Sequence, residues 1–422
     1  MNIKEEIKVR FDKMQSKNDL LDLLNLVRPE IFPDVSFQFS MDQLNKNISY
    51  HSKNPNQGET ESILNLAIIE KLGGKVYGGR YKTFQIRKKS GSLRTIHAPN
   101  SGLKAILKCI NYIFQVIHTP HKNAFGFVPN KSIVDNARKH EDQNYVYNLD
   151  LKDFFPSVDQ ARVRGRLLVA PFHLDSSPER IKLASILAIL CCHLMDVERW
   201  DETTQKWETK KLNVLPQGAP TSPTITNMIC ERLDIRLTKL ATAYNCKYSR
   251  YADDITFSSM HNVYQKDGTF ITKLNEIITK ERFHVQETKT RLQKRGYKQE
   301  VTGLIVNEKV NVDTRYIKEL RHWLYLWERY GYDKATALFM VKYNKNKGHV
   351  KQGNPKLENV IWGKLEYLKM VKGYNNPLYI KLNARYVQLM SQNIDQIIDV
   401  WEKEGIEQAM TLYFLNRKLK IS

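Results

Sequence analysis

Two groups of aspartates lie where the chain otherwise has the pattern of a β-strand, and they restrict the fold more than any other feature. Asp150 ends the run YVYNLD, and Asp253 and Asp254 are adjacent in YSRYADDITFSS. Taken singly, an Asp at a strand end often caps the next helix, and an adjacent Asp pair is usually a solvated turn. Adjacent carboxylates, however, repel one another unless a cation holds them together. Three carboxylates on two neighbouring strands are the arrangement that holds two Mg²⁺ ions about 4 Å apart for in-line phosphoryl transfer.

The charge balance favours an anionic partner. The chain of 422 residues carries 66 Lys and Arg against 45 Asp and Glu, which gives a formal net charge of +21. Residues 71–140 hold fourteen basic residues and one acid, so +13 of this excess lies in one segment. The longest apolar stretch, 183–195, is too short to span a bilayer. Five cysteines without CxxC spacing argue against a disulfide framework. We therefore expect a cytoplasmic protein that binds nucleic acid and does not associate with a membrane.

The periodicity predicts an α+β chain in three parts. Apolar residues at helical spacing in 21–28 and 61–72 predict a helical N-terminal region over residues 1–70. Residues 71–310 begin with a basic hairpin and a helix, and then alternate short strands with helices around a central sheet. Residues 311–422 are again helical in pattern. The basic hairpin is either a phosphate-binding surface or a solvated edge whose lysines block aggregation.

Three motifs in this order resemble those of a known enzyme family. The runs LDLKDFFPS (149–157), LPQGAPTSP (215–223) and YADD (251–254) are similar to motifs A, B and C of the reverse transcriptases, and the resemblance covers about residues 76–310. It implies a right-hand polymerase, with fingers and palm over 71–310 and a thumb in 311–422. It also implies that Asp150, Asp253 and Asp254 are the catalytic residues and bind two Mg²⁺ ions, with dNTPs as substrates.

The resemblance also implies which residues surround the incoming nucleotide. The predicted nucleotide-binding residues are Lys88, Arg94, Phe155, Gln217, Gly218 and Ala252. Phe155 corresponds to an aromatic that excludes a ribose 2′-hydroxyl by steric clash. Because neighbours on a strand face opposite ways, one of Phe154 and Phe155 must instead be core. Gly218 allows close backbone approach, although its loop is also typical of a turn that starts a helix.

Basic residues complete the predicted site. Arg94, with Lys88 as the second choice, corresponds to the residues that grip the triphosphate, and a solvated strand is the competing interpretation of Lys88. Lys289 corresponds to a catalytic lysine that protonates the leaving pyrophosphate, and an ordinary basic surface residue is the alternative.

Two shorter signatures resemble those of the retron reverse transcriptases, which copy part of their own structured RNA into a branched RNA–DNA product. They are NARKH (136–140), which fits an NAxxH pattern, and VTG (301–303). Asn136 and His140 lie one helical turn apart and are predicted either to contact RNA or to brace the fingers. Residues 341–373 carry eight lysines and two acids, which makes Lys351 and Lys364 further RNA-binding candidates.

The resemblance implies a structured non-coding RNA and its DNA product as partners, a possible companion effector protein, and a role in anti-phage defence. A non-templated or protein-primed polymerase of a stand-alone defence system would use the same carboxylates and is the alternative function. The priming group and the oligomeric state stay open at this point. A catalytically inactive RNA-binding scaffold is disfavoured, because all three aspartates are present.

Overall fold

The computed structural model describes residues 2–49, 79–87, 91–346, 354–408 and 410. The predicted helix at 61–72 and the candidates Lys88 and Lys351 lie outside this described part. The chain divides into two compact units, of which the first comprises Met1–Ile86, Leu93–Lys139 and Gln143–Lys294. The second comprises Arg87–Ser92, His140–Asp142 and Arg295–Ser422.

A four-stranded antiparallel sheet is the centre of the first unit. Its order is β6-β7-β3-β8, with β3 at Tyr145–Asp150, β6 at Lys247–Tyr251, β7 at Asp254–Ser259 and β8 at Arg291–Lys294. In the register of β3 with β7, Asp150 lies opposite Asp254. Because the two strands are antiparallel, the end of β3 meets the start of β7. The two acidic groups that the sequence singles out therefore meet at one edge of the sheet.

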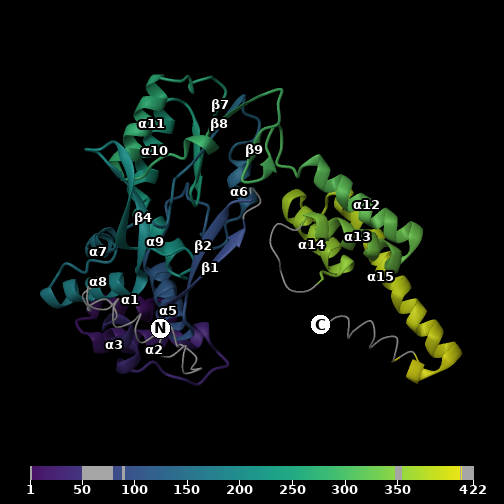
Figure 1. Ribbon diagram of the computed structural model, residues 1–422, viewed down its shortest axis with the longest axis horizontal. Helices are drawn as coiled ribbons and strands as arrows, with labels where there is room; N and C mark the ends of the chain where they lie inside the picture. The colour runs from purple at the N-terminus through teal and green to yellow at the C-terminus, as the bar shows by residue number, and fades with distance from the viewer. Residues whose placement is uncertain (1, 50–78, 88–90, 347–353, 409, 411–422) are drawn as a thin grey trace. The chain divides into compact units, whose positions relative to one another are not determined.

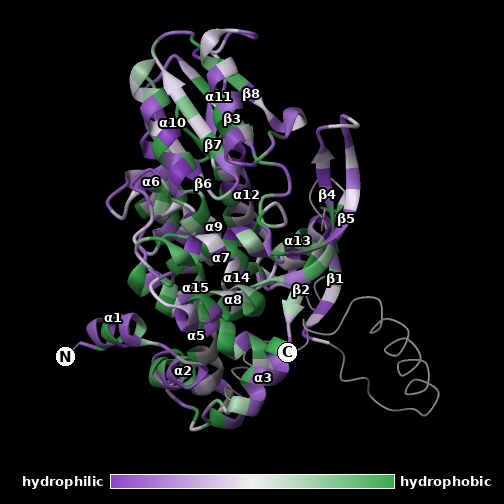
Figure 2. Ribbon diagram, turned by 90° about the vertical axis from the view of Figure 1, so that its left-hand side faces the viewer, coloured by the Kyte–Doolittle hydropathy of each residue, from purple (hydrophilic) through white to green (hydrophobic). Residues whose placement is uncertain are grey.

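Two amphipathic helices pack beside this sheet, and one of them positions the strand before the YADD turn. Helix α10 (Glu231–Ala243) packs on α11 (Thr269–Lys280), which lies beside it in Figure 1, and on β6, which is labelled in Figure 2. Helix α11 buries apolar residues four apart, namely Phe270, Leu274 and Ile278. This spacing places them on one face, so the helix covers the core with a single apolar stripe.

Elsewhere in the first unit, the described residues are mostly helical and include two hairpins. Its helices are α1 (Ile3–Lys13), α2 (Lys17–Ile31), α3 (Met41–Ser49), α5 (Ser101–Ile117), α6 (Ile133–Arg138), α7 (Gln160–Leu168), α8 (Pro178–Cys191), α9 (Ser222–Ile229) and the 3-10 turn η1 (Glu287–Lys289). The hairpins are β1–β2 (Tyr81–Arg87, Leu93–Pro99) and β4–β5 (His193–Asp201, Lys206–Val214). The strands of the predicted basic hairpin are thus confirmed. Hydrophilic residues run along β4 and β5 (Figure 2).

The N-terminal helices share a core with the elements that follow. Helices α1 and α2 pack against α5, and Phe11 and Phe114 both contact Phe172. The buried guanidinium of Arg180 in α8 donates to the backbone oxygens of Phe11 and Met14, at 3.4 and 3.2 Å. These carbonyls end α1, so Arg180 links the N-terminal region to the rest of the unit.

The second unit is helical after two short strands, as the tail pattern predicts. It holds β9 (Glu300–Val301), β10 (Leu304–Ile305), α12 (Thr314–Tyr330), α13 (Tyr332–Asn346), α14 (Leu357–Lys372) and α15 (Pro377–Glu404). Trp323 and Trp327 are buried in its core, whereas Trp362 is exposed. Among the described residues, no helix has both the length and the apolar character to cross a membrane.

Candidate active site

Three aspartates converge at the junction of β3, β6 and β7. Asp150 is the last residue of β3, Asp254 is the first of β7, and Asp253 lies in the turn that joins β6 to β7. The backbone oxygen of Asp253 accepts a hydrogen bond from the amide of Leu151 at 3.1 Å, which ties the turn to the chain after β3. The structure therefore brings together the residues that the sequence predicted as metal ligands.

The carboxylates disturb one another electrostatically. The pKa of Asp254 is raised to about 7, first by desolvation from the surrounding protein and then by the negative charges of Asp253 and Asp150. The residue nevertheless remains accessible to solvent. The pKa of Asp253 is also raised, first by burial and then by Asp150, against the opposing charges of Lys289 and Arg94. Keeping Asp254 fully ionised at neutral pH thus requires additional positive charge nearby.

The residues fit a divalent metal by chemistry. Carboxylate oxygens are the ligands that Mg²⁺ prefers, and their mutual repulsion is what a cation would relieve. In the described part of the chain, no three His, Cys, Asp or Glu side chains are already gathered into a metal-binding group. The assignment of Asp150, Asp253 and Asp254 as ligands of two ions therefore stays a prediction.

Lys289 forms an ion pair with one of the three aspartates. Its ammonium lies 2.7 Å from Oδ1 of Asp150, and its side chain is 59% exposed. The turn that carries it is positioned by the backbone oxygen of Asp150, which accepts a hydrogen bond from the amide of Gln286 at 2.7 Å. Lys289 thus places positive charge beside the carboxylates from a position that solvent can reach. Its role as a proton donor stays a prediction.

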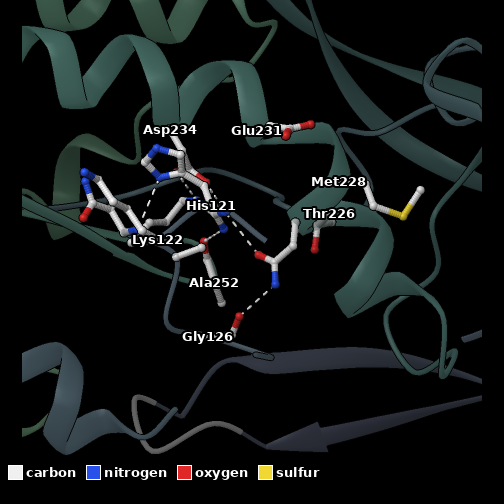
Figure 3. Close-up of polar contacts among 12 residues, drawn as sticks. His121, Lys122, Gly126, Thr226, Met228, Glu231, Asp234 and Ala252 are labelled. Atoms are coloured by element: carbon white, nitrogen blue, oxygen red, sulfur yellow. Dashed lines mark hydrogen bonds and ion pairs between the residues drawn. The ribbon is translucent and has the colours of Figure 1, made fainter. Parts of the chain in front are cut away.

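A buried ion pair supports the YADD turn from beneath. Arg250 and Asp234 are both fully buried, and the guanidinium donates to both carboxylate oxygens, at 2.8 and 2.7 Å. The same guanidinium donates to the backbone oxygen of Ala252 at 3.1 Å and to Oδ1 of Asn227 at 3.1 Å. Asn227 in turn donates to the backbone oxygen of Gly126 at 2.9 Å. Figure 3 shows Asp234, Ala252 and Gly126 around this network, which fixes the backbone next to Asp253.

Gly126 packs directly against that turn. A Cβ added at Gly126 would lie 2.3 Å from the amide nitrogen of Ala252 and 2.9 Å from the carbonyl carbon of Tyr251. Ala252 itself has a φ of 57°, so the turn already adopts the left-handed conformation and has little freedom to move aside. The sequence reasoning did not select Gly126 or Arg250. Arg250 could have been selected by the argument used for Asp150, because a charged residue inside a predicted strand needs a partner or a function.

Gly126→Ala is expected to lower nucleotide incorporation by about 100-fold, because the added methyl group displaces the backbone that carries Asp253. Steady-state primer extension measures the effect. Gly165→Ala is the matched control, since a Cβ at Gly165 in α7 meets no atom within 4 Å. That variant should retain wild-type synthesis and gain roughly 0.5–1 kcal/mol in stability. Equal activity of the two variants would contradict the proposed contact.

The motif B loop is held against the β1–β2 hairpin. The backbone oxygen of Gln217 accepts a hydrogen bond from the amide of His97 at 2.8 Å. Gly218 has a φ of 128°, and a Cβ there would lie 2.7 Å from the backbone oxygen of His97. The close backbone approach predicted for Gly218 is therefore present, and its partner is β2. The nucleotide-binding roles of Gln217 and Gly218 stay predictions.

The other predicted nucleotide contacts differ in exposure. Phe154 is buried and Phe155 is half-buried, so Phe154 is the core member of the pair. Both residues lie in the turn after β3 and not on a strand, so the alternation assumed from the sequence does not apply to them. The ring of Phe155 lies 6.0 Å from that of Phe127. Arg94 is exposed, and its charge partly opposes the rise in the pKa of Asp253 that burial causes. Its role in binding the triphosphate stays a prediction.

None of the described RNA-binding candidates is fully exposed. Asn136 and His140 are both buried, which favours the bracing role over direct contact with RNA. The ammonium of Lys364 lies 2.9 Å from Glu319 and 4.5 Å from the ring centre of Tyr316. These contacts occupy Lys364 within its own unit, so its binding of RNA stays a prediction.

Comparison with known proteins agrees with the motifs. Residues 86–307 match the family described as "Reverse transcriptase (RNA-dependent DNA polymerase)". The retron Mx65 reverse transcriptase of Myxococcus xanthus is 36% identical over 257 residues, which is 58% of this chain and 55% of that protein. The retron Ec86 reverse transcriptase of Escherichia coli is 33% identical over 250 residues, which is 57% of this chain and 68% of that protein.

The chain thus spans about half the length of the Myxococcus relative. Among solved structures, telomerase from Candida albicans aligns with 79% of this chain and 66% of its own, at 10% identity and a TM-score of 0.37. The family match covers just over half of the chain, and the Escherichia relative is covered over two thirds of its length. The chain therefore belongs to the reverse transcriptase family and, within it, to the retron reverse transcriptases.

Proposed function

We propose that this protein is an RNA-directed DNA polymerase that copies a structured, cognate non-coding RNA into DNA by two-metal-ion nucleotidyl transfer. The convergence of Asp150, Asp253 and Asp254 at the ends of β3 and β7 is the observation that supports this reaction most directly. Family membership supports the same chemistry. A role in anti-phage defence, with a companion effector protein, belongs to the proposal on the family resemblance alone.

Each side chain then has a defined task. A hydroxyl oxygen attacks the α-phosphorus of a dNTP, the bond to the β-phosphate bridging oxygen breaks, and pyrophosphate leaves. When bound between the three carboxylates, Mg²⁺ would supply the positive charge that activates the hydroxyl and stabilises the leaving group. Arg94 attracts the triphosphate. The ammonium of Lys289 lies 2.7 Å from Asp150, so it would be close enough to the reacting phosphates to donate a proton to the leaving pyrophosphate.

The first experiment separates this proposal from the alternative function. The protein is co-expressed with its cognate RNA, and the cellular DNA product is isolated and treated with RNase and a debranching enzyme. A product that changes mobility on debranching has a 2′–5′ branch to RNA, which is the expected result. DNA with a free 5′ end, or DNA attached to a protein side chain, would contradict the retron reaction and support the stand-alone alternative.

Phe155→Val is expected to increase ribonucleotide incorporation at least about 10-fold relative to dNTPs, since a smaller side chain no longer clashes with a 2′-hydroxyl. Competition between each dNTP and its rNTP measures the discrimination. The control is Phe154→Leu, because Phe154 is buried against Phe283 and should affect stability rather than sugar choice. Unchanged discrimination in the Phe155 variant would place the sugar gate elsewhere.

A further inference from the structure

Four lysines of the first unit gather beside β6 and α6. They are Lys122, Lys131, Lys139 and Lys247, and we refer to them as the lysine cluster. Lys122 precedes the segment that pairs with β6, Lys131 lies just before α6, Lys139 caps the end of α6, and Lys247 begins β6. No task in the proposed polymerase reaction uses these side chains.

The two inner members of the lysine cluster donate hydrogen bonds to neutral acceptors. The ammonium of Lys131 donates to the backbone oxygens of Lys122 and Ala124, at 2.9 and 2.8 Å, and lies 4.6 Å from the ring centre of Phe125. The ammonium of Lys139 donates to Oδ1 of Asn123 and lies 5.9 Å from the same ring. The ammonium groups of Lys131 and Lys139 therefore both lie near the ring of Phe125. Their hydrogen-bond acceptors are uncharged oxygens, so these bonds do not neutralise the two positive charges.

The charges of the lysine cluster are incompletely neutralised. Burial, followed by the positive charges of Lys122, Lys131 and Lys247, lowers the pKa of Lys139 to about 8. Burial also lowers the pKa of Lys131, against the opposing charges of Asp135 and Asp234. Asp234 is already committed to Arg250, and Asp135 to capping α6 through Ser132. These two carboxylates therefore do not fully neutralise the lysine cluster, and a bound anion would stabilise its remaining positive charge.

The position of the lysine cluster suggests what that anion is. The amide of Arg250 donates to the backbone oxygen of Asn123 at 2.9 Å, and the amide of Phe125 donates to that of Arg250 at 2.8 Å. The segment that carries Lys122 is therefore bonded to the strand that ends at the YADD turn. Lys122 and Lys247 are exposed, so a ligand can reach the cluster from solvent. Figure 3 shows Lys122 and His121 on the side of the ion-pair network where Asp234 lies.

We propose that the lysine cluster binds the phosphodiester backbone of the RNA, at a site separate from the aspartates. The segment that carries Lys122 is hydrogen-bonded to β6, so a phosphate held here would lie beside the strand that leads into the YADD turn. The identity of the ligand as RNA depends on the proposed function, whereas the anion site itself depends only on the lysines. An acidic protein segment is the alternative ligand, and the experiment below distinguishes it.

The test measures the affinity of the full chain for a synthetic RNA stem-loop at a series of salt concentrations. Lys122→Gln/Lys139→Gln/Lys247→Gln removes three cluster charges but keeps Lys131, whose backbone contacts hold the loop. If these lysines bind phosphates, the slope of log affinity against log salt should become shallower by about 0.7 to 0.9 for each phosphate that the variant no longer neutralises. The matched control is Lys210→Gln/Lys280→Gln/Lys298→Gln, in which every lysine removed is paired with a carboxylate. The control should keep the wild-type slope.

A second measurement does not depend on the folding of a variant. The native protein is treated at pH 8 with an acylating reagent, with and without RNA, and modified lysines are identified by mass spectrometry. RNA should protect Lys139 and Lys122 several-fold, and it should leave Lys210 unprotected. An equal salt slope for the two triple variants, or the absence of this protection, would overturn the anion site. Protection by a polyglutamate peptide but not by RNA would overturn the choice of RNA.

These outcomes separate the anion site from the polymerase proposal. DNA synthesis on a primed RNA template is measured in the same preparations. If synthesis and RNA binding are normal but the lysine cluster is unprotected, the anion site is wrong and the polymerase proposal stands. If the folded protein neither binds RNA nor extends a primer, both proposals fail.

Discussion

Replacement of Asp254 by asparagine is expected to reduce DNA synthesis by about 100- to 1,000-fold, because one charge that would hold the catalytic cations is removed. The same reduction is expected for Asp150→Asn, since the two residues lie opposite one another in the sheet. RNA binding should persist, because carboxylates repel phosphate. Single-turnover primer extension and RNA affinity are measured on the same preparations.

The control for this pair is Asp153→Asn. Asp153 is an exposed residue in the turn that follows β3, three residues after Asp150. Its φ of 46° suits asparagine as well as aspartate. The control should retain synthesis within a few-fold of wild type. If Asp150→Asn or Asp254→Asn retained as much activity as Asp153→Asn, the assignment of the catalytic carboxylates would be wrong.

The raised pKa of Asp254 adds a readout that does not depend on activity. Its pKa is about 7 in the folded protein without metal, against the ordinary value of 3.8 expected after unfolding. Between these values the folded state binds the additional proton, so this group lowers stability as pH rises from about 4 to 7. Mg²⁺ should reverse this destabilisation by favouring the ionised carboxylates, and thermal unfolding at pH 7 should shift upward on its addition. Asp254→Asn should weaken that shift.

The second large effect is expected at the buried ion pair. Asp234→Asn should lower the free energy of unfolding by about 3–5 kcal/mol, because Arg250 would keep its charge in the interior without a counter-ion. Tyr248 also donates to Oδ1 of Asp234, at 2.6 Å, so the substitution disturbs a third buried group. Denaturant unfolding measures the decrease. The control is Glu276→Gln, which breaks the exposed pair with Lys280 at 3.6 Å and should change stability by less than about 0.5 kcal/mol.

Arg250→Lys distinguishes a positioning role from stability alone. A lysine keeps the charge beside Asp234 but cannot also donate to the backbone oxygen of Ala252 and to Asn227. We expect kcat for nucleotide addition to fall at least about 10-fold well below the melting temperature, with a smaller change in KM for dNTP. Wild-type kcat in a folded Arg250→Lys protein would show that the network serves stability only.

Local sequence patterns predicted the three carboxylates of the candidate site but not the residues that support them. Asp150, Asp253 and Asp254 were recognisable because a carboxylate in a strand context is costly unless it has a function. Phe154 and Phe155 illustrate the limit, since the alternation argument assumed a strand, whereas the structure places both residues in a turn and buries Phe154. Asn136 and His140 were chosen by motif, and their burial became known only from the packing of α6 and its surroundings.

The sequence by itself indicated a basic hairpin followed by alternating short strands and helices, the three candidate carboxylates and the resemblance to the family, because these follow from local periodicity and short motifs. Only the tertiary structure decided that Asp150 lies opposite Asp254, that Gly126 packs on the YADD turn, and that Arg250 reaches both Asp234 and Ala252. The lysine cluster likewise joins residues from distant parts of the chain. Strand register, burial and the resulting pKa shifts depend on which distant segments pack together, and no local pattern carries that information.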